Sequence, residues 1–357
     1  MAAVFLAAIL FFPFRVNALS AERAIVMDAD SGHVLYERES DSRSLIASTT
    51  KIMTALIVCE QCNVLDRVRI PDEAVGIEGS SIYLKAGEVL TVQELLYGLM
   101  LHSGNDAAVA LAIYCGGTVE GFSQLMNDKA HMLKMYNSHF ANPHGLDAPN
   151  HYSSARDLAV LTAYAMKNPI FQQTVSTKHV NITGRSLRNH NKLLWRLEGA
   201  DGVKTGFTKA AGRILVSSAL RNGRRLVAVT INAPNDWSDH ALLMNAGFSD
   251  YAELNLVHQG DPLATVAVNG GEADNVTLLA AQDVSCSIAV WEDPRVVIKE
   301  SGPIFAPVIR GQAAGNAFIY IDDAVIGAVP LVFGETVERK NENDLSFWDK
   351  LLGRDRQ

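Results

Sequence analysis

The sequence predicts an α+β fold in which an antiparallel sheet packs against a cluster of helices, followed by a small β-rich domain. Apolar residues alternate on both sides of Asp30-Ser31-Gly32, which indicates a first β-hairpin. From Gly202 onward a strand–turn–strand–turn–strand pattern follows, and Arg221-Asn222-Gly223 is a strong hairpin signal within it. Short alternating runs separated by Gly, Asp and Asn begin near Leu256 and predict the β-rich domain.

The helical cluster is predicted from apolar residues that recur with a helical period between the two groups of strands. A helix is expected from Ser48 to Val58, and two more on either side of residues 102–105, where Gly104 and Asn105 indicate a break. Further helices are expected at Ser154–Met166, with capping residues Ser153, Ser154 and Asp157, and at about Trp237–Gly247.

The first 18 residues have the pattern of a secretory signal peptide. Their apolar core of about a dozen residues is too short to span a bilayer, and Val16-Asn17-Ala18 supplies small residues for cleavage. The mature chain is therefore expected to begin near Leu19, outside the cytoplasm. The remaining boundaries are expected at 19–255 for the main domain, 256–340 for the β-rich domain and 341–357 for a charged linker and a short tail.

The tail has an apolar stripe formed by Leu345, Trp348, Leu351 and Leu352. This stripe suits contact with a membrane surface. A short helix that docks on its own domain explains the stripe nearly as well, because the stripe is short and residues 341–357 carry no net positive charge.

The composition excludes some classes of partner. The chain of 357 residues is 48% hydrophobic and 20% charged, as in a soluble globular protein of two or three domains. Its net charge is -8 and it has no cluster of Lys or Arg, so a nucleic-acid partner is not expected.

The four cysteines are Cys59, Cys62, Cys115 and Cys286. Cys59 and Cys62 form a C-x-x-C, but they lie within an expected helix and no second Cys/His pair has zinc spacing, so no metal site is expected. Buried thiols are the favoured interpretation. A Cys59–Cys62 bridge in an exported chain stays open.

Ser48 and Lys51 form an S-x-x-K at the start of the first expected helix. By itself this pattern is better explained by a helix cap. Two further motifs change that interpretation: Ser103 and Asn105 form an S-x-N, and Lys204-Thr205-Gly206 is a K-T-G on an expected strand. The three motifs in this order are those of penicillin-binding proteins and class A β-lactamases.

The chemistry of an acyl transfer explains the residue types. Residues three apart share a helix face, so Lys51 can reach the Ser48 hydroxyl. Lys51 must be neutral to accept a proton, and burial together with the second cation at Lys204 would lower its pKa. Lys204 and Thr205 suit a terminal carboxylate, and Gly206 lets an extended peptide lie close to the strand.

The resemblance extends beyond these motifs. Residues 79–112, 140–166, 189–194 and 201–212 are similar to the low-molecular-mass penicillin-binding proteins of the D-alanyl-D-alanine carboxypeptidase family. The match covers about Arg23 to Phe248, and the β-rich remainder resembles the family's C-terminal domain less specifically. The resemblance implies the penicillin-binding fold, a β-lactamase-like transpeptidase fold, for the main domain.

The resemblance implies roles in the site for eight residues. Ser48 would be the acylated nucleophile, Lys51 its base, and Ser103 and Asn105 would complete the proton network. Lys204, Thr205 and Gly206 would bind the substrate, and the backbone N–H groups of Ser48 and Phe207 would form the oxyanion hole. No metal or organic cofactor is implied. His144, in the loop 142–147, is interpreted as structural and stays outside the site.

The implied function is a serine-type D-Ala-D-Ala carboxypeptidase that trims peptidoglycan stem pentapeptides and is acylated by β-lactams. Three alternatives stay open: a β-lactamase, a peptidoglycan endopeptidase on the same fold, and a non-catalytic wall-binding protein. A class A β-lactamase needs a Glu between the second and third motifs, and the Glu of Ala252–Asn255 comes after the third. The intact Ser48, Lys51 and Lys204 argue against a binding module.

Overall fold

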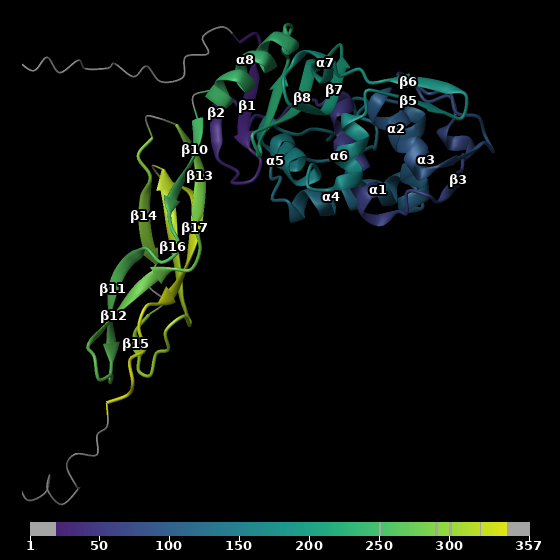
Figure 1. Ribbon diagram of the computed structural model, residues 1–357. Helices are drawn as coiled ribbons and strands as arrows, with labels where there is room; N and C mark the ends of the chain where they lie inside the picture. The colour runs from purple at the N-terminus through teal and green to yellow at the C-terminus, as the bar shows by residue number, and fades with distance from the viewer. Residues whose placement is uncertain (1–18, 250, 290–291, 300–301, 322, 341–357) are drawn as a thin grey trace, which may run out of the picture. The chain divides into compact units, whose positions relative to one another are not determined.

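The computed structural model describes residues 19–249, 251–289, 292–299, 302–321 and 323–340 (Figure 1). The chain divides into two compact units after Ala252. The expected signal peptide and tail lie outside the described residues. Within the described part of the chain, no helix is both long and apolar enough to cross a membrane.

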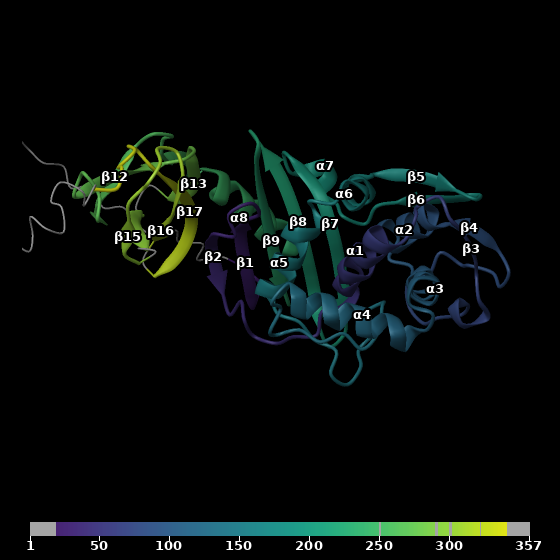
Figure 2. The same ribbon diagram turned by 90° about the horizontal axis from the view of Figure 1, so that it is seen from below.

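The first unit contains a five-stranded antiparallel sheet in the order β2-β1-β9-β8-β7 (Figure 2). The two expected groups of strands are confirmed and join through β1 and β9. The strands are β1 (Arg23–Asp28), β2 (Val34–Arg38), β7 (Ala200–Thr208), β8 (Gly212–Arg221) and β9 (Arg224–Ile231). The turn between β8 and β9 places Asn222 and Gly223 at φ values of 50° and 84°, the positive angles that an Asn-Gly hairpin turn requires. Strand β7, which carries the K-T-G, lies at the edge of the sheet.

Both faces of this sheet are covered. Six consecutive residues of β8, Ile214–Ala219, are buried, whereas a sheet with one wet face would alternate. Ile214 and Val216 belong to the core shared with the helical cluster. The opposite face packs on α8 (Asp236–Ser249), where His240 lies between Ser217 and Thr230 at 2.6 and 2.9 Å.

The helical cluster surrounds α1 (Lys51–Gln61), whose first nine residues are all buried. A helix that is apolar on every side belongs in the middle of a core. Around it lie α2 (Val92–Leu101), α3 (Asn105–Gly116), α4 (Val119–Met132), α5 (Ala155–Ala165) and α6 (Pro169–Ser176), whereas α7 (Leu193–Arg196) packs on β7. Two hairpins, β3 (Arg67–Arg69) with β4 (Val89–Thr91) and β5 (His179–Ile182) with β6 (Arg185–Arg188), and the 3-10 turn η2 (Asp72–Ala74) complete the unit.

Local capping explains several helix boundaries. Thr91 and Glu94 form a capping box at the start of α2, and Ser154 accepts a hydrogen bond from the Asp157 N–H at the start of α5, as the sequence predicts. One expectation is wrong in detail. Ser48 does not lie in the α-helix but in the preceding 3-10 turn η1 (Ala47–Thr50), and the α-helix begins only at Lys51.

The second unit is rich in β structure, as expected. One sheet has the order β14-β16-β17-β12-β11-β15, and β10 pairs with β13 in a second. The strands are β10 (Tyr251–Val257), β11 (Pro262–Asn269), β12 (Asn275–Ala280), β13 (Val284–Ala289), β14 (Arg295–Lys299), β15 (Ile304–Phe305), β16 (Ala313–Ile321) and β17 (Ala324–Phe333).

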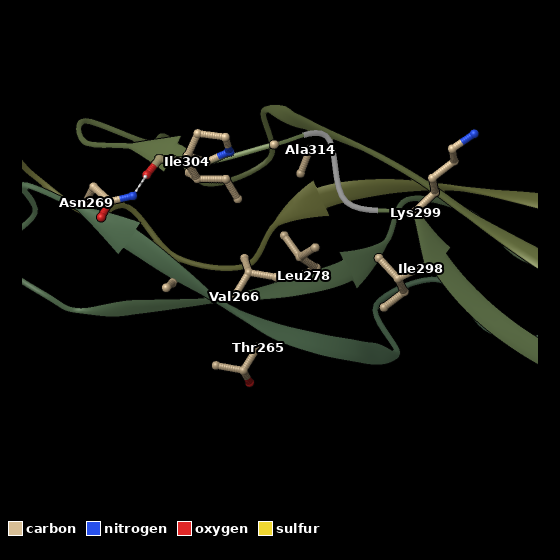
Figure 3. Close-up of a pocket in the computed structure, with 11 residues that line it drawn as sticks. Thr265, Val266, Asn269, Leu278, Ile298, Lys299, Ile304 and Ala314 are labelled. Carbon is tan, nitrogen blue, oxygen red and sulfur yellow. Dashed lines mark hydrogen bonds between the residues drawn. The ribbon is translucent and has the colours of Figure 1, made fainter.

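This unit has a groove of about 400 Å³. Val266, Leu278, Ile298 and Ile304 line it (Figure 3), and Lys299 is the only titratable group among its described lining residues. Acid–base chemistry needs at least one further group of suitable pKa. The groove is therefore a poor candidate for a reaction site.

Candidate active site

Three segments far apart in the sequence meet around the Lys51 ammonium. Its Nζ lies 3.2 Å from the Ser48 Oγ, 2.6 Å from the Asn105 Oδ1 and 2.6 Å from the backbone carbonyl of His144. Lys51 is completely buried, whereas Ser48 is half-buried. The structure thus brings the first motif and the Asn of the second motif into one hydrogen-bonded group.

The turn η1 and the first residue of α1 present Ser48 and Lys51 on one side. In a 3-10 turn the side chains at positions i and i+3 eclipse each other, so the S-x-x-K spacing brings both groups together directly. Ala47 has a φ of 44°, which an L-residue rarely adopts. The Thr49 hydroxyl donates to the Ile46 carbonyl at 2.6 Å and holds this conformation. Such local strain is concentrated at functional sites.

A loop that follows α4 forms hydrogen bonds with the end of η1 and with the first turn of α1. The Thr50 hydroxyl lies 2.8 Å from the His151 Nε2, and the Thr54 hydroxyl donates to the Pro143 carbonyl at 2.7 Å. Gly145, at a φ of 90°, packs so closely on the Ala47 carbonyl that a side chain there would collide with it.

The carbonyl of His144 is a contact that the sequence analysis missed. The interpretation of His144 as structural concerns its side chain, whose Nδ1 accepts from the Leu146 N–H at 3.1 Å. Burial, and next the Lys51 charge, lower the His144 pKa to about 4, so the ring is neutral at pH 7. Every residue has a carbonyl, so only the turn-forming Asn-Pro-His-Gly could have drawn attention to this segment.

The connection between α2 and α3 carries the second motif. Asn105 opens α3, and its Nδ2 donates to the Glu78 carbonyl at 2.5 Å while its Oδ1 accepts from Lys51. Ser103 has a φ of 63° and is buried, yet its hydroxyl has no hydrogen-bond partner among the described residues. The structure therefore joins Ser48, Lys51 and Asn105 by hydrogen bonds, but not Ser103. A buried hydroxyl without a partner is costly and requires an explanation.

The third motif lies on β7, directly against η1. A Cβ placed on Gly206 would lie 3.2 Å from the Ile46 carbonyl. The absence of a side chain at Gly206 therefore lets β7 pack closely against η1, beside Ser48. Lys204 is 1% exposed and donates to the Thr205 carbonyl at 2.8 Å. Thr205 is half-buried, and the Phe207 side chain is 63% exposed.

Burial lowers the pKa values of both lysines, and the charge of Lys204 also acts on Lys51. Burial lowers the pKa of Lys204 to about 7. Burial also lowers the pKa of Lys51 well below its ordinary value, the Lys204 charge lowers it further, and Asp106 opposes this. Desolvation disfavours the charged form of an amine, and a neighbouring cation adds to that effect. The neutral form of Lys51 is consequently more accessible than that of an ordinary lysine.

Asp106 holds the loop that precedes the second motif. Its carboxylate accepts hydrogen bonds from the Ser81 hydroxyl at 2.6 Å and from the N–H groups of Ile82 and Leu84 at 3.1 and 3.0 Å. The same loop supplies the Glu78 carbonyl to Asn105.

Replacing Asp106 by alanine is therefore expected to lower the free energy of unfolding by about 2–4 kcal/mol, because buried backbone N–H groups lose their acceptor. Urea denaturation of the purified protein measures this. The control is Asp128→Ala, which removes an exposed acid from α4 and should change little. Equal midpoints for the two variants would contradict this role of Asp106.

Within the described residues, no group of three or more His, Cys, Asp or Glu side chains is placed to hold a metal ion. The chemistry of the site is that of a hydroxyl, two amines and an amide. A serine hydroxyl beside a buried lysine of lowered pKa, between a helical cluster and the edge of an antiparallel sheet, defines a serine-type hydrolase.

Comparison with known proteins agrees with this class. Residues 13–235 match the family model described as D-alanyl-D-alanine carboxypeptidase, and residues 251–339 match that of the penicillin-binding protein 5 C-terminal domain. The chain is 32% identical to D-alanyl-D-alanine carboxypeptidase DacF of Bacillus subtilis, over 94% of this chain and 90% of that protein. It is 33% identical to DacD of Escherichia coli, over 88% and 86% of the two chains.

Solved structures give the same result. The crystal structure of penicillin binding protein 5 from Haemophilus influenzae matches with a TM-score of 0.76 and 29% identity, over 90% of this chain and 98% of that chain. That of the carboxypeptidase DacD from Francisella tularensis matches with a TM-score of 0.72 and 27% identity, over 93% and 97%. The chain belongs to the D-alanyl-D-alanine carboxypeptidase family, the S11 peptidases, which are serine-type penicillin-binding proteins.

Proposed function

We propose that the enzyme removes the terminal D-alanine from peptidoglycan stem pentapeptides through an acyl-enzyme on Ser48, with Lys51 as its general base. The observation that carries the proposal is the arrangement around Lys51. Its Nζ has two close acceptors, Asn105 Oδ1 and the His144 carbonyl, both at 2.6 Å, and a more distant third neighbour, Ser48 Oγ at 3.2 Å. A neutral amine has two N–H bonds for the close acceptors and keeps a lone pair for the Ser48 proton.

In acylation the Ser48 proton passes to Lys51 while the Ser48 oxygen attacks the carbonyl carbon of the penultimate D-alanine. The N–H groups of Ser48 and Phe207 hold the oxyanion that forms, and each such donor is typically worth a hundred- to a thousand-fold in rate. The C–N bond then breaks, and the departing D-alanine amine receives a proton through Ser103. The buried hydroxyl of Ser103, which has no partner within the described residues, is available for that relay.

Deacylation reverses these roles. Water gives a proton to the Lys51 and Ser103 network, attacks the ester carbon and releases the shortened peptide with the Ser48 hydroxyl restored. Asn105 orients the Lys51 amine by accepting a hydrogen bond from it. The Asn105 side-chain amide also hydrogen-bonds the amide of the substrate.

Lys204 and Thr205 bind the terminal carboxylate of the substrate. A buried ammonium is costly without a charged partner, and an incoming carboxylate supplies one. Because β7 is the edge strand of its sheet, an extended peptide can add to it by backbone hydrogen bonds. The close approach of Gly206 to η1 places that peptide beside Ser48.

We place the enzyme outside the cytoplasm, in the cell wall or at the outer face of the membrane, because residues 1–18 have a signal-peptide pattern. β-Lactams would acylate the same serine, and the apolar stripe of the tail would contact the membrane surface. Removal of D-alanine would limit the donors for wall cross-linking and so affect cell shape.

A class A β-lactamase is the less favoured alternative. Such an enzyme deacylates with the help of a Glu between the second and third motifs. The two glutamates between Asn105 and Lys204 are Glu120 and Glu198, and both are exposed.

The proposal is tested with labelled penicillin and with a stem pentapeptide that ends in D-Ala-D-Ala. We expect one covalent adduct, on Ser48, and release of free D-alanine, and Ser48→Ala should lose both. The control Ser42→Ala removes a hydroxyl that donates to Glu39 outside the site and should keep both.

Each other outcome identifies an alternative. Absence of any adduct favours a non-catalytic wall-binding protein. An adduct that hydrolyses quickly without D-alanine release from the peptide favours a β-lactamase. Cleavage of cross-linked stem peptides in preference to the pentapeptide favours an endopeptidase.

A further inference from the structure

Two of the four cysteines lie at the C-terminal ends of two neighbouring helices, α1 and α3. Cys62 follows α1 directly, and Cys115 lies in the last turn of α3. The Cys115 thiol donates to the Oε1 of Gln61, the residue before Cys62, at 3.6 Å, and its neighbour Tyr114 donates to the Asp66 carboxylate at 2.8 Å. Cys62 and Cys115 also shift each other's pKa, as neighbouring thiols do. This end of α3 is thus attached to the end of α1 and to the segment that follows it.

The same two helices also meet at their first residues. Lys51 opens α1 and Asn105 opens α3, and the two side chains are hydrogen-bonded at 2.6 Å. The distances along the chain are nearly equal, from residue 51 to 62 and from 105 to 115. The helices therefore run side by side in the same direction, with the Lys51–Asn105 contact at one end and the Gln61–Cys115 contact at the other.

The surroundings distinguish these thiols from Cys59. Cys59 lies one turn earlier in α1, it is 7% exposed, and burial raises its pKa to about 12. Cys62 and Cys115 are half-buried, so reagents can reach them. The neighbouring Cys62 lowers the pKa of the Cys115 thiol, whereas Cys115 and burial raise that of Cys62. Cys115 is consequently the sulfur that ionises first.

We propose that Cys62 and Cys115 form a disulfide that joins the ends of α1 and α3. The oxidant is an external disulfide, such as that of an extracytoplasmic dithiol oxidase or oxidised glutathione. The Cys115 thiolate attacks one sulfur of that disulfide, which releases a first thiol and leaves a mixed disulfide on Cys115. Cys62 then loses its proton, attacks the Cys115 sulfur and releases the second thiol. Two hydrogens leave the protein, and the oxidant is reduced to two thiols.

This pairing differs from the one that the C-x-x-C suggests. Cys59 and Cys62 are neighbours in sequence, but Cys59 belongs to the core side of α1 and packs in the main hydrophobic cluster. The partner of Cys62 is instead 53 residues away in the sequence. A crosslink that closes a loop of this length restricts the unfolded chain strongly.

The experiment uses the full chain treated with oxidised glutathione or with dithiothreitol. Each sample is denatured, alkylated with iodoacetamide and weighed intact. The oxidised chain is expected to carry alkyl groups on two of its four cysteines, and the reduced chain on four. Proteolysis after Glu60 separates Cys59 from Cys62, so peptide mapping of the unmutated chain identifies the linked pair. Reduction should lower Tm by roughly 5–10 °C.

Matched variants complete the test. Cys62→Ser and Cys115→Ser should each abolish the crosslink, whereas Cys59→Ser and Cys286→Ser should keep it. Four alkylated cysteines in the oxidised chain would overturn the proposal, and so would a crosslink that maps to Cys59. Since the readouts are mass and Tm, the result is independent of whether the peptidase assignment of Ser48 holds.

Discussion

Replacing Lys51 by methionine is expected to slow the acylation of the protein by penicillin by roughly 10²- to 10⁴-fold, the usual contribution of a general base. Methionine fills a similar volume but cannot accept the Ser48 proton. It also leaves Asn105 Oδ1 and the His144 carbonyl without the donor that now lies 2.6 Å from each. The second-order rate constant of acylation with labelled penicillin measures the effect.

The control is Lys209→Met, which removes an exposed lysine just beyond β7 and should leave the rate unchanged. The pH dependence of the unmutated enzyme gives a second check. Because only neutral Lys51 accepts a proton, the rate should fall as the pH is lowered, with a midpoint well below the pKa of an ordinary lysine. An acylation rate of Lys51→Met near that of the unmutated protein would exclude Lys51 as the base.

Replacing Lys204 by methionine is expected to raise stability while it weakens peptide turnover. The unfolded chain has a lysine pKa of about 10.4, whereas burial lowers that of Lys204 to about 7. The unfolded state therefore binds the proton more tightly, and the charged lysine costs stability. That cost is complete below pH 7, where it is about 5 kcal/mol, and it disappears as the pH rises toward 10.

The variant Lys204→Met should thus have a higher Tm than the unmutated protein at pH 6, and the difference should shrink at alkaline pH. At the same time kcat/KM for the stem pentapeptide should fall by roughly 10²-fold, since a charge-assisted contact with the carboxylate is lost. Thermal denaturation across pH and D-alanine release measure the two effects. A Tm at pH 6 below that of the Lys209→Met control would contradict the stability argument, and an unchanged kcat/KM would contradict the carboxylate assignment.

Much of the architecture could be predicted because its signals are local. The Asn222-Gly223 turn, the Ser154 cap and the break at Gly104 each depend on the conformational preferences of a few consecutive residues, and the structure confirms all three. The three motifs could be recognised for a similar reason, since each has a short and regular spacing.

The remaining features depend on contacts between distant segments. Ser48 lies in a 3-10 turn rather than an α-helix, in a segment where Gly145 and Gly206 pack against Ala47 from two other parts of the chain. The His144 carbonyl has no sequence signal at all. For the cysteines, the sequence left a Cys59–Cys62 bridge open, whereas in the fold Cys115 contacts Gln61, the residue before Cys62.

The burial of α1 on every side has a consequence for how the enzyme loses function. Local openings in a protein begin in segments with few buried contacts, and the elements at the centre of the core open only with the whole structure. The proposed nucleophile Ser48 adjoins α1 and the proposed base Lys51 begins it, and the first nine residues of this helix are all buried. Heating or denaturant should therefore leave η1 intact until cooperative unfolding of the whole first unit, so that the loss of activity and the loss of fold are one event.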